Sequence, residues 1–219
     1  MKKINAIENS KITLPYNIIV ILGKVIIGIF TSSFFMIINA FYSVGITSAK
    51  CLTLKTDLDI KNIKESNIYD KRMLAYNNYK TIGIIILVSS IFYTTYSVKN
   101  FFWPSNTEYS LIAGLVIAIV TFVELTISII GIVLAKKREN VVYETMKLIN
   151  LVSSFIALVL TQTALLSFSH TGDTSVYNGI SGLIFGSLSI IVGVYMIVHS
   201  HFAVKGLELQ YIRKSDIVI

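Results

Sequence analysis

SFFMIINAFYSVGI, residues 33–46, lies inside an apolar tract that runs from Asn17 to Ala49 and contains one charged residue, Lys24. A straight helix over the whole tract would be about 50 Å long at 1.5 Å per residue, whereas the hydrocarbon core of a bilayer is about 30 Å thick. The tract is therefore either one overlong helix or two short spans, residues 17–33 and 36–53, with a turn near Thr31.

The composition of the rest of the chain is that of a membrane protein. Of its 219 residues, 54% are hydrophobic and 14% charged, and the mean hydropathy is +0.71. These apolar segments do not alternate with polar residues, as the strands of a membrane barrel do, so we expect an all-α, polytopic membrane protein. The remaining spans are predicted over residues 80–102, 109–135, 148–168 and 177–203.

The distribution of basic residues decides between five and six spans. With six spans, 17 of the 19 Lys and Arg residues, Lys50 among them, fall in flanks on one side, while Lys99 is on the other and Lys24 lies within a span. With five spans, the three N-terminal lysines would instead fall on the side of the membrane that holds few basic residues. The positive-inside rule therefore predicts six transmembrane helices with both termini cytoplasmic.

This count defines the expected organisation of the chain. Residues 1–16 are a cytoplasmic N-terminal segment, residues 17–204 the six-helix transmembrane domain and residues 205–219 a cytoplasmic tail. The longest hydrophilic segment, 55–79, is too short for a soluble catalytic domain. The usage of Ile, Lys and Asn suggests a bacterial protein, so the expected location is the bacterial cytoplasmic membrane.

Several classes of function are disfavoured by the sequence. The net charge of +7 is placed between apolar spans, which fits cytoplasmic loops in contact with the bilayer rather than nucleic-acid binding. No phosphate-binding loop, activated nucleophile or metal motif is present, and His199 and His201, two residues apart, do not share a helix face. We expect no enzyme activity, cofactor or metal site.

Glu124 and Lys24 are the two ionisable residues predicted at membrane depth. Such residues are costly in hydrocarbon and mark either a functional site or an internal pair. Glu124 is thus a proton carrier or a paired structural glutamate. Lys24 either pairs with Glu124 or extends its ammonium group to the membrane interface.

Polar residues on the second and fifth spans are further candidates. Asn39 and Tyr42 share a helix face and would hydrogen-bond to a neighbouring helix or contact a substrate. Glu144 and Lys147 begin a polar stripe on the fifth span, which is either an internal pathway or an ordinary helix start at the interface.

Small residues open the sixth span. Gly179, Gly182 and Gly186 lie three and four residues apart, a spacing that lets helix backbones approach closely. They are predicted to pack against another helix of the chain or of a second copy, which makes a homodimer possible.

The order of these features resembles the membrane domain of the cation diffusion facilitator family. Asn17, Lys24, Gly28 and the turn at 31–33 match its first span, and residues 39–46, NAFYSVGI, fall on its Asp-Ala-x-His-Ser-x-x-Asp motif. The likeness covers about residues 17–204. It implies six spans, cytoplasmic termini, homodimers and exchange of divalent metals for protons.

The metal ligands implied by this resemblance are missing. The four ligand positions are occupied by residues that do not bind zinc in the ordinary way: Tyr42, Ile46, Lys147 and Leu151. An ammonium group at Lys147 would repel a dication, and we expect it to take the place of the cation beside Glu144 or Glu124. The cytoplasmic metal-binding domain of the family has no counterpart in these 219 residues.

Two functions remain open at this point. The chain is a small secondary transporter of an unidentified substrate other than a divalent metal, coupled to protons through Glu124. Alternatively, it is a non-transporting structural or interaction protein that kept the helix bundle and lost the site.

Overall fold

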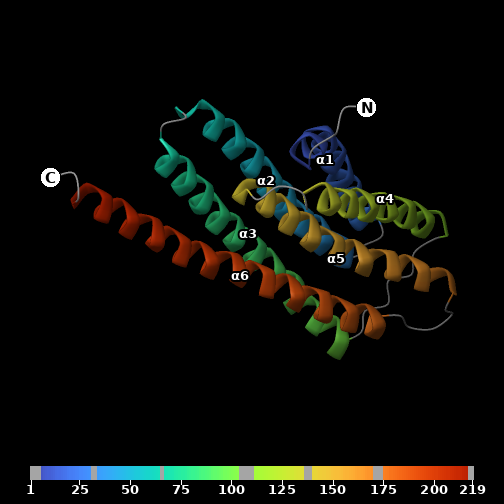
Figure 1. Ribbon diagram of the computed structural model, residues 1–219. Helices are drawn as coiled ribbons and strands as arrows, with labels where there is room; N and C mark the ends of the chain where they lie inside the picture. Colours follow the sequence, from blue (N-terminus) through green and yellow to red (C-terminus); the bar gives the residue numbers. More distant parts are fainter. Residues whose placement is uncertain are drawn as a thin grey trace.

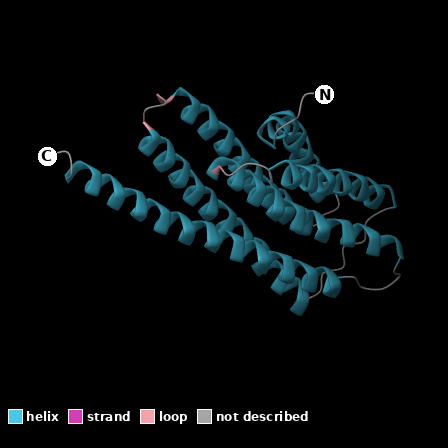
Figure 2. Ribbon diagram, viewed as in Figure 1, coloured by secondary structure: helices cyan, strands magenta, loops and turns pink. Residues whose placement is uncertain are grey.

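The fold is described from a computed structural model, over residues 6–30, 34–64, 67–103, 111–135, 140–169 and 175–216. These residues form helices and no strand (Figure 2). Figure 1 shows the six helices. Their bounds are α1 Ala6–Phe30, α2 Phe34–Asn62, α3 Ile68–Phe102, α4 Leu111–Ala135, α5 Val141–Ser169 and α6 Ser175–Asp216.

The apolar tract that opens the sequence forms two helices. α1 ends at Phe30 and α2 begins at Phe34, which confirms the division of the tract, although the predicted turn at 31–33 lies outside the described residues. Five of the described helices, α2 to α6, are long and apolar enough to cross a membrane, as expected of a multi-pass membrane protein. α1 is not among these five.

The helices are longer than the predicted spans. α2 continues to Asn62 instead of ending at 53, α3 begins at Ile68 instead of 80, and α6 continues to Asp216 instead of 203. The predicted loop at 55–79 is therefore mostly helix. Hydropathy marks only the part of a helix that suits hydrocarbon, whereas its backbone hydrogen bonds continue into water, where pairs such as Lys61–Asp57 stabilise it.

The helices form two groups. α3 packs mainly against α6, whereas α1, α2, α4 and α5 contact one another as α1–α2, α4–α5, α2–α5 and α1–α4 pairs. α2–α3 and α5–α6 contacts join the groups, around a buried core that includes Tyr42, Tyr93 and Met196. The connection between α2 and α3 and the C-terminal end of α6 lie at the same end of the molecule (Figure 1).

The glycines of α6 pack within the chain. A Cβ atom at Gly182 would lie 2.3 Å from Ser97 Oγ, one at Gly186 2.3 Å from Thr94 Oγ1, and one at Gly179 2.9 Å from the backbone of Phe101. All three contacts are with α3. The sequence allowed these glycines to pack against another helix of the chain or against a second copy, and the structure shows them packed within the chain.

Candidate functional site

An ion pair lies between α1 and α4. Lys24 Nζ is 2.8 Å from Glu124 Oε2, and the two side chains are 5% and 14% exposed. Helices α1 and α4 contact each other, so the pair joins two elements that are 100 residues apart in sequence. Of the two arrangements predicted for Lys24, pairing with Glu124 is the one observed.

Ser43 connects this pair to α2. The ammonium group of Lys24 also donates a hydrogen bond to Ser43 Oγ at 3.0 Å, and Ser43 in turn donates to the carbonyl of Asn39, one turn earlier, at 2.9 Å. Lys24 thus contacts side chains of both α2 and α4. A charged group in a low-dielectric interior needs several such partners to offset the loss of water.

Lys50 is a second buried lysine beside the pair. Only 3% of it is exposed, and within the described residues it has no ion pair and no hydrogen bond. Glu124 lines the same cavity as Lys50 and is the one carboxylate in that lining. Lys50 was predicted as a flank residue, but α2 continues for three further turns beyond it and the residue is buried inside the bundle.

These groups surround a small polar cavity of about 20 Å³, the size of one or two water molecules. Its walls come from four helices. The lining residues are Asn17, Lys24, Tyr42, Ser43, Ile46, Thr47, Lys50, Glu124, Ser153, Ile156 and Ala157. α1, α2 and α4 each contribute charge to the cavity, whereas α5 contributes none.

Asn39 and Tyr42 share a helix face but differ in their surroundings. Asn39 is fully buried but donates its amide to the Phe35 carbonyl of its own helix at 2.8 Å, because a buried amide one turn from a carbonyl can satisfy it locally. Tyr42 packs its ring against Tyr93 of α3, with centroids 5.6 Å apart, and also lines the cavity. Asn39 does not line it.

The polar residues at the start of α5 lie outside the cavity. Glu144 accepts a hydrogen bond from the Tyr79 hydroxyl at 2.9 Å. Within the described residues Lys147 forms no ion pair with Glu144 or Glu124. The expected pairing of Lys147 with Glu124 is therefore wrong, because Lys24 neutralises that carboxylate.

The α5 residues that face Tyr42 differ from those implied by the resemblance. Ser153, Ile156 and Ala157 line the cavity with Tyr42 and Ile46, whereas Lys147 and Leu151 do not. The contact between α2 and α5 is thus about one to two turns further along α5. None of these five lining side chains carries a nitrogen, sulfur or carboxylate ligand for zinc.

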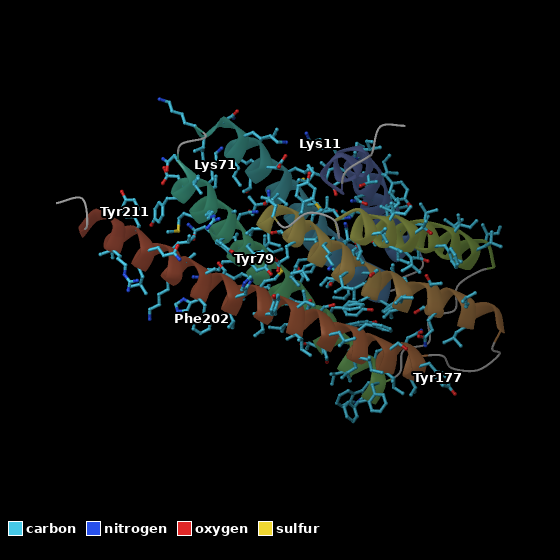
Figure 3. The ribbon with its side chains drawn as sticks, viewed as in Figure 1. Lys11, Lys71, Tyr79, Tyr177, Phe202 and Tyr211 are labelled. Carbon is cyan, nitrogen blue, oxygen red and sulfur yellow. The ribbon has the colours of Figure 1, made fainter. Side chains whose placement is uncertain are left out.

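A cluster around His199 escaped the sequence analysis. The imidazole of His199 contacts the rings of Tyr76, Tyr79 and Tyr195 at centroid distances of 6.1, 5.7 and 5.6 Å. Tyr79, labelled in Figure 3, is also the residue that donates to Glu144. Helix spacing puts Tyr195 beside His199 on α6 and Tyr76 beside Tyr79 on α3, but the sequence offered no signal that these two pairs meet, because they come together only through the α3–α6 contact.

No protein-family model matches the chain, and no curated protein matches it. In the part of the chain that the structure describes, no three His, Cys, Asp or Glu side chains lie close enough together to hold a metal ion. The site must therefore be interpreted from its own chemistry.

Proposed function

We propose that the chain is a small secondary transporter whose substrate site is the cavity between α1, α2, α4 and α5. The observation that carries this proposal is Lys50, a buried lysine that forms no ion pair or hydrogen bond with any described residue and lies beside an ion pair that is already complete. A pair alone would suffice to join α1 to α4. A further unpaired charge in the bundle costs stability, and intramembrane charges that are kept at such cost typically serve ion or substrate pathways.

The chemistry of Glu124 supports coupling to protons. One carboxylate faces two ammonium groups, and its attraction holds Lys24 at 2.8 Å. A proton on Glu124 would remove that attraction and leave two positive groups facing each other. Proton uptake and rearrangement of the site would then occur together, which is what coupled transport requires.

We further propose the orientation in the membrane. Six spans with both termini cytoplasmic place the α2–α3 connection and the adjoining helix ends, which carry Lys61, Lys64 and Lys71, on the cytoplasmic side. α6 has 42 residues and would be about 63 Å long, roughly twice the hydrocarbon thickness. Its C-terminal half, together with the ends of α2 and α3, would project from the bilayer on that side, where Figure 3 shows Lys71 and Tyr211.

A structural role is the second candidate. The Lys24–Glu124 contact favours it, because the two charges compensate each other with good geometry and lock α1 against α4. The small volume of the cavity favours it as well. In this case Lys50 would have no functional role, and the bundle would serve contacts with other membrane components.

Flux measurements on purified protein in liposomes separate the two candidates. Proton movement is followed with an internal pH dye under imposed gradients of sodium, potassium, chloride and small organic ions. We expect the wild type to move protons with one of these gradients and Glu124→Gln to lose at least about nine-tenths of the rate, since the coupling carboxylate is gone.

Glu208→Gln is the matched control, because it removes an exposed carboxylate of α6. It should transport as the wild type does. Size-exclusion chromatography before reconstitution establishes that each variant is folded. Absence of flux in the wild type under every gradient would instead support the structural role.

A further inference from the structure

We propose that the cavity binds a small monovalent anion of about the size of chloride, held between Lys50 of α2 and Asn17 of α1. This inference deepens the proposed function, on which it rests as a statement about the transported substrate. Three properties of the cavity lead to it: its net charge, its unpaired hydrogen-bond donors and its size.

The charges that line the cavity do not balance. Lys24 and Lys50 contribute two ammonium groups, and Glu124 contributes one carboxylate. The other eight lining residues are uncharged at neutral pH, so one positive charge remains. A net charge in a buried site is strongly unfavourable unless a counter-charge accompanies it, and an anion beside Lys50 supplies that charge.

The unpaired hydrogen-bond donors at the cavity also favour a negatively charged ligand. The Asn17 side-chain Nδ2 is buried and has no hydrogen-bond partner. Lys50 is 3% exposed and forms no hydrogen bond within the described residues. Asn17 Nδ2 and Lys50 Nζ are donors, and the Tyr42 hydroxyl, which is also buried without a partner at this cavity, can donate or accept. Asn17 and Lys24 lie seven residues apart on α1, hence on the same helix face, which directs Asn17 toward the charged groups. Buried donors without acceptors are rare, and an anion accepts from both.

The size and the positive charge restrict the ligand. A volume of about 20 Å³ holds one or two waters, so a monatomic anion fits, whereas sulfate, phosphate and organic acids do not. Two ammonium groups repel a metal cation. A water molecule would satisfy the donors but would leave the charge of Lys50 uncompensated.

Binding is tested with chloride on the purified full-length protein in nanodiscs. The line width of the ³⁵Cl resonance is measured at constant ionic strength, with gluconate as the replacing anion. We expect wild-type protein to broaden the chloride line and bromide to compete for the same site. Excess sulfate should leave the broadening unchanged.

Lys50→Met removes the charge and keeps the length of the side chain, and it should weaken chloride binding by about tenfold or more. Lys55→Met is the matched control, because Lys55 is an exposed lysine five residues further along α2. It should bind chloride as the wild type does. Asn17→Leu, which leaves Lys50 in place, should weaken binding by a smaller factor and tests the site if Lys50→Met fails to fold.

Two results would overturn the anion site: no chloride broadening by the wild type, or broadening that Lys50→Met and Asn17→Leu both retain. Other results distinguish a failure of the proposed transport function from a failure of the anion site. Chloride binding without flux under any gradient refutes transport and leaves the anion site standing. Proton flux with a gradient other than chloride, in protein that binds no chloride, refutes the anion site and leaves transport standing.

Discussion

At the scale of single residues, one carboxylate serves two ammonium groups. Lys24 Nζ lies 2.8 Å from Glu124 Oε2, and Lys50 lines the same cavity without a partner in the part of the chain that the structure describes. Removing either member of a buried pair leaves an uncompensated charge. The two removals are not equivalent here, because loss of Glu124 leaves two positive groups, whereas loss of Lys24 leaves Glu124 with Lys50 nearby.

This asymmetry predicts the outcome of a double-mutant cycle. Glu124→Gln should lower the free energy of unfolding by about 3 to 5 kcal/mol, Lys24→Met should lower it by less, and the double variant should be more stable than Glu124→Gln alone. Thermal unfolding in detergent, monitored by circular dichroism, measures the order. Equal effects of the two single changes would contradict the sharing of the carboxylate.

Lys61→Met provides the control for this cycle. Lys61 pairs with Asp57 at 2.5 Å, but its side chain is 63% exposed. The Asp57 side chain is 11% exposed, so water screens mainly the ammonium end of the pair, and the loss should cost less than that of Glu124→Gln.

Part of the site could be predicted from the sequence. Lys24 and Glu124 are recognisable because each interrupts an apolar span, and a buried charge must find a partner. Lys50 could not be recognised, because it stands near the end of the apolar run in α2, where a lysine at the interface is ordinary. Its burial depends on the neighbouring helices that form the cavity with α2, including α5 with Ser153 and Ile156, and no local pattern specifies this arrangement.

At the scale of elements, close backbone contact dominates the α3–α6 pair. A Cβ atom at Gly193 would lie 3.0 Å from Gly83 O and 3.0 Å from Leu87 N, and one at Gly83 would lie 3.0 Å from Gly193 O. The obstructing atoms belong to the backbone, so they cannot turn aside as a side chain can. The two glycines allow the helix axes to approach closely at this crossing.

Gly193→Ala should therefore destabilise the protein by about 1 to 3 kcal/mol, because the added methyl group forces the helices apart. Gly206→Ala on the same helix is the control, since nothing lies within 4 Å of a Cβ atom there. The control should be neutral or stabilising by up to about 1 kcal/mol through helix propensity. Thermal unfolding of both variants compares the positions, and equal behaviour would argue against a tight crossing.

Helices were predictable as elements, but their ends and partners were not. The spacing of Gly179, Gly182 and Gly186 indicated a packing face without indicating which helix covers it, because the hydroxyl groups of Ser97 and Thr94 that fill the gaps have no pattern of their own. The ends of α2 and α3 extend beyond the apolar runs because polar residues such as Asp57 and Lys61 continue a helix in water.

At the scale of the whole molecule, the helix order alternates between two ends. The α2–α3 connection, which contains Lys64, and the end of α6 share one end (Figure 1). In a Cys51→Ser background, a cysteine at Lys64 should react with an impermeant maleimide only after the cells are opened. A cysteine at Asn106 should react in intact cells.

Lys205→Cys is the second cytoplasmic reporter and should behave like Lys64→Cys. Mass spectrometry of the labelled protein gives the fraction modified at each position. Labelling of the Lys64 and Asn106 positions from the same side would contradict an odd number of spans between them and, with it, the proposed topology.

The pairing of α3 with α6 also sets the order in which the chain can assemble during synthesis. α3 leaves the ribosome early, but its main partner is the last helix to be made. Until α6 enters the membrane, the glycine and hydroxyl face of α3, with Gly83, Thr94 and Ser97, has no helix to cover it. A chain halted after α5 would present this face to lipid or to quality-control proteases, so completion of α6 is the step that commits the newborn protein to its final form.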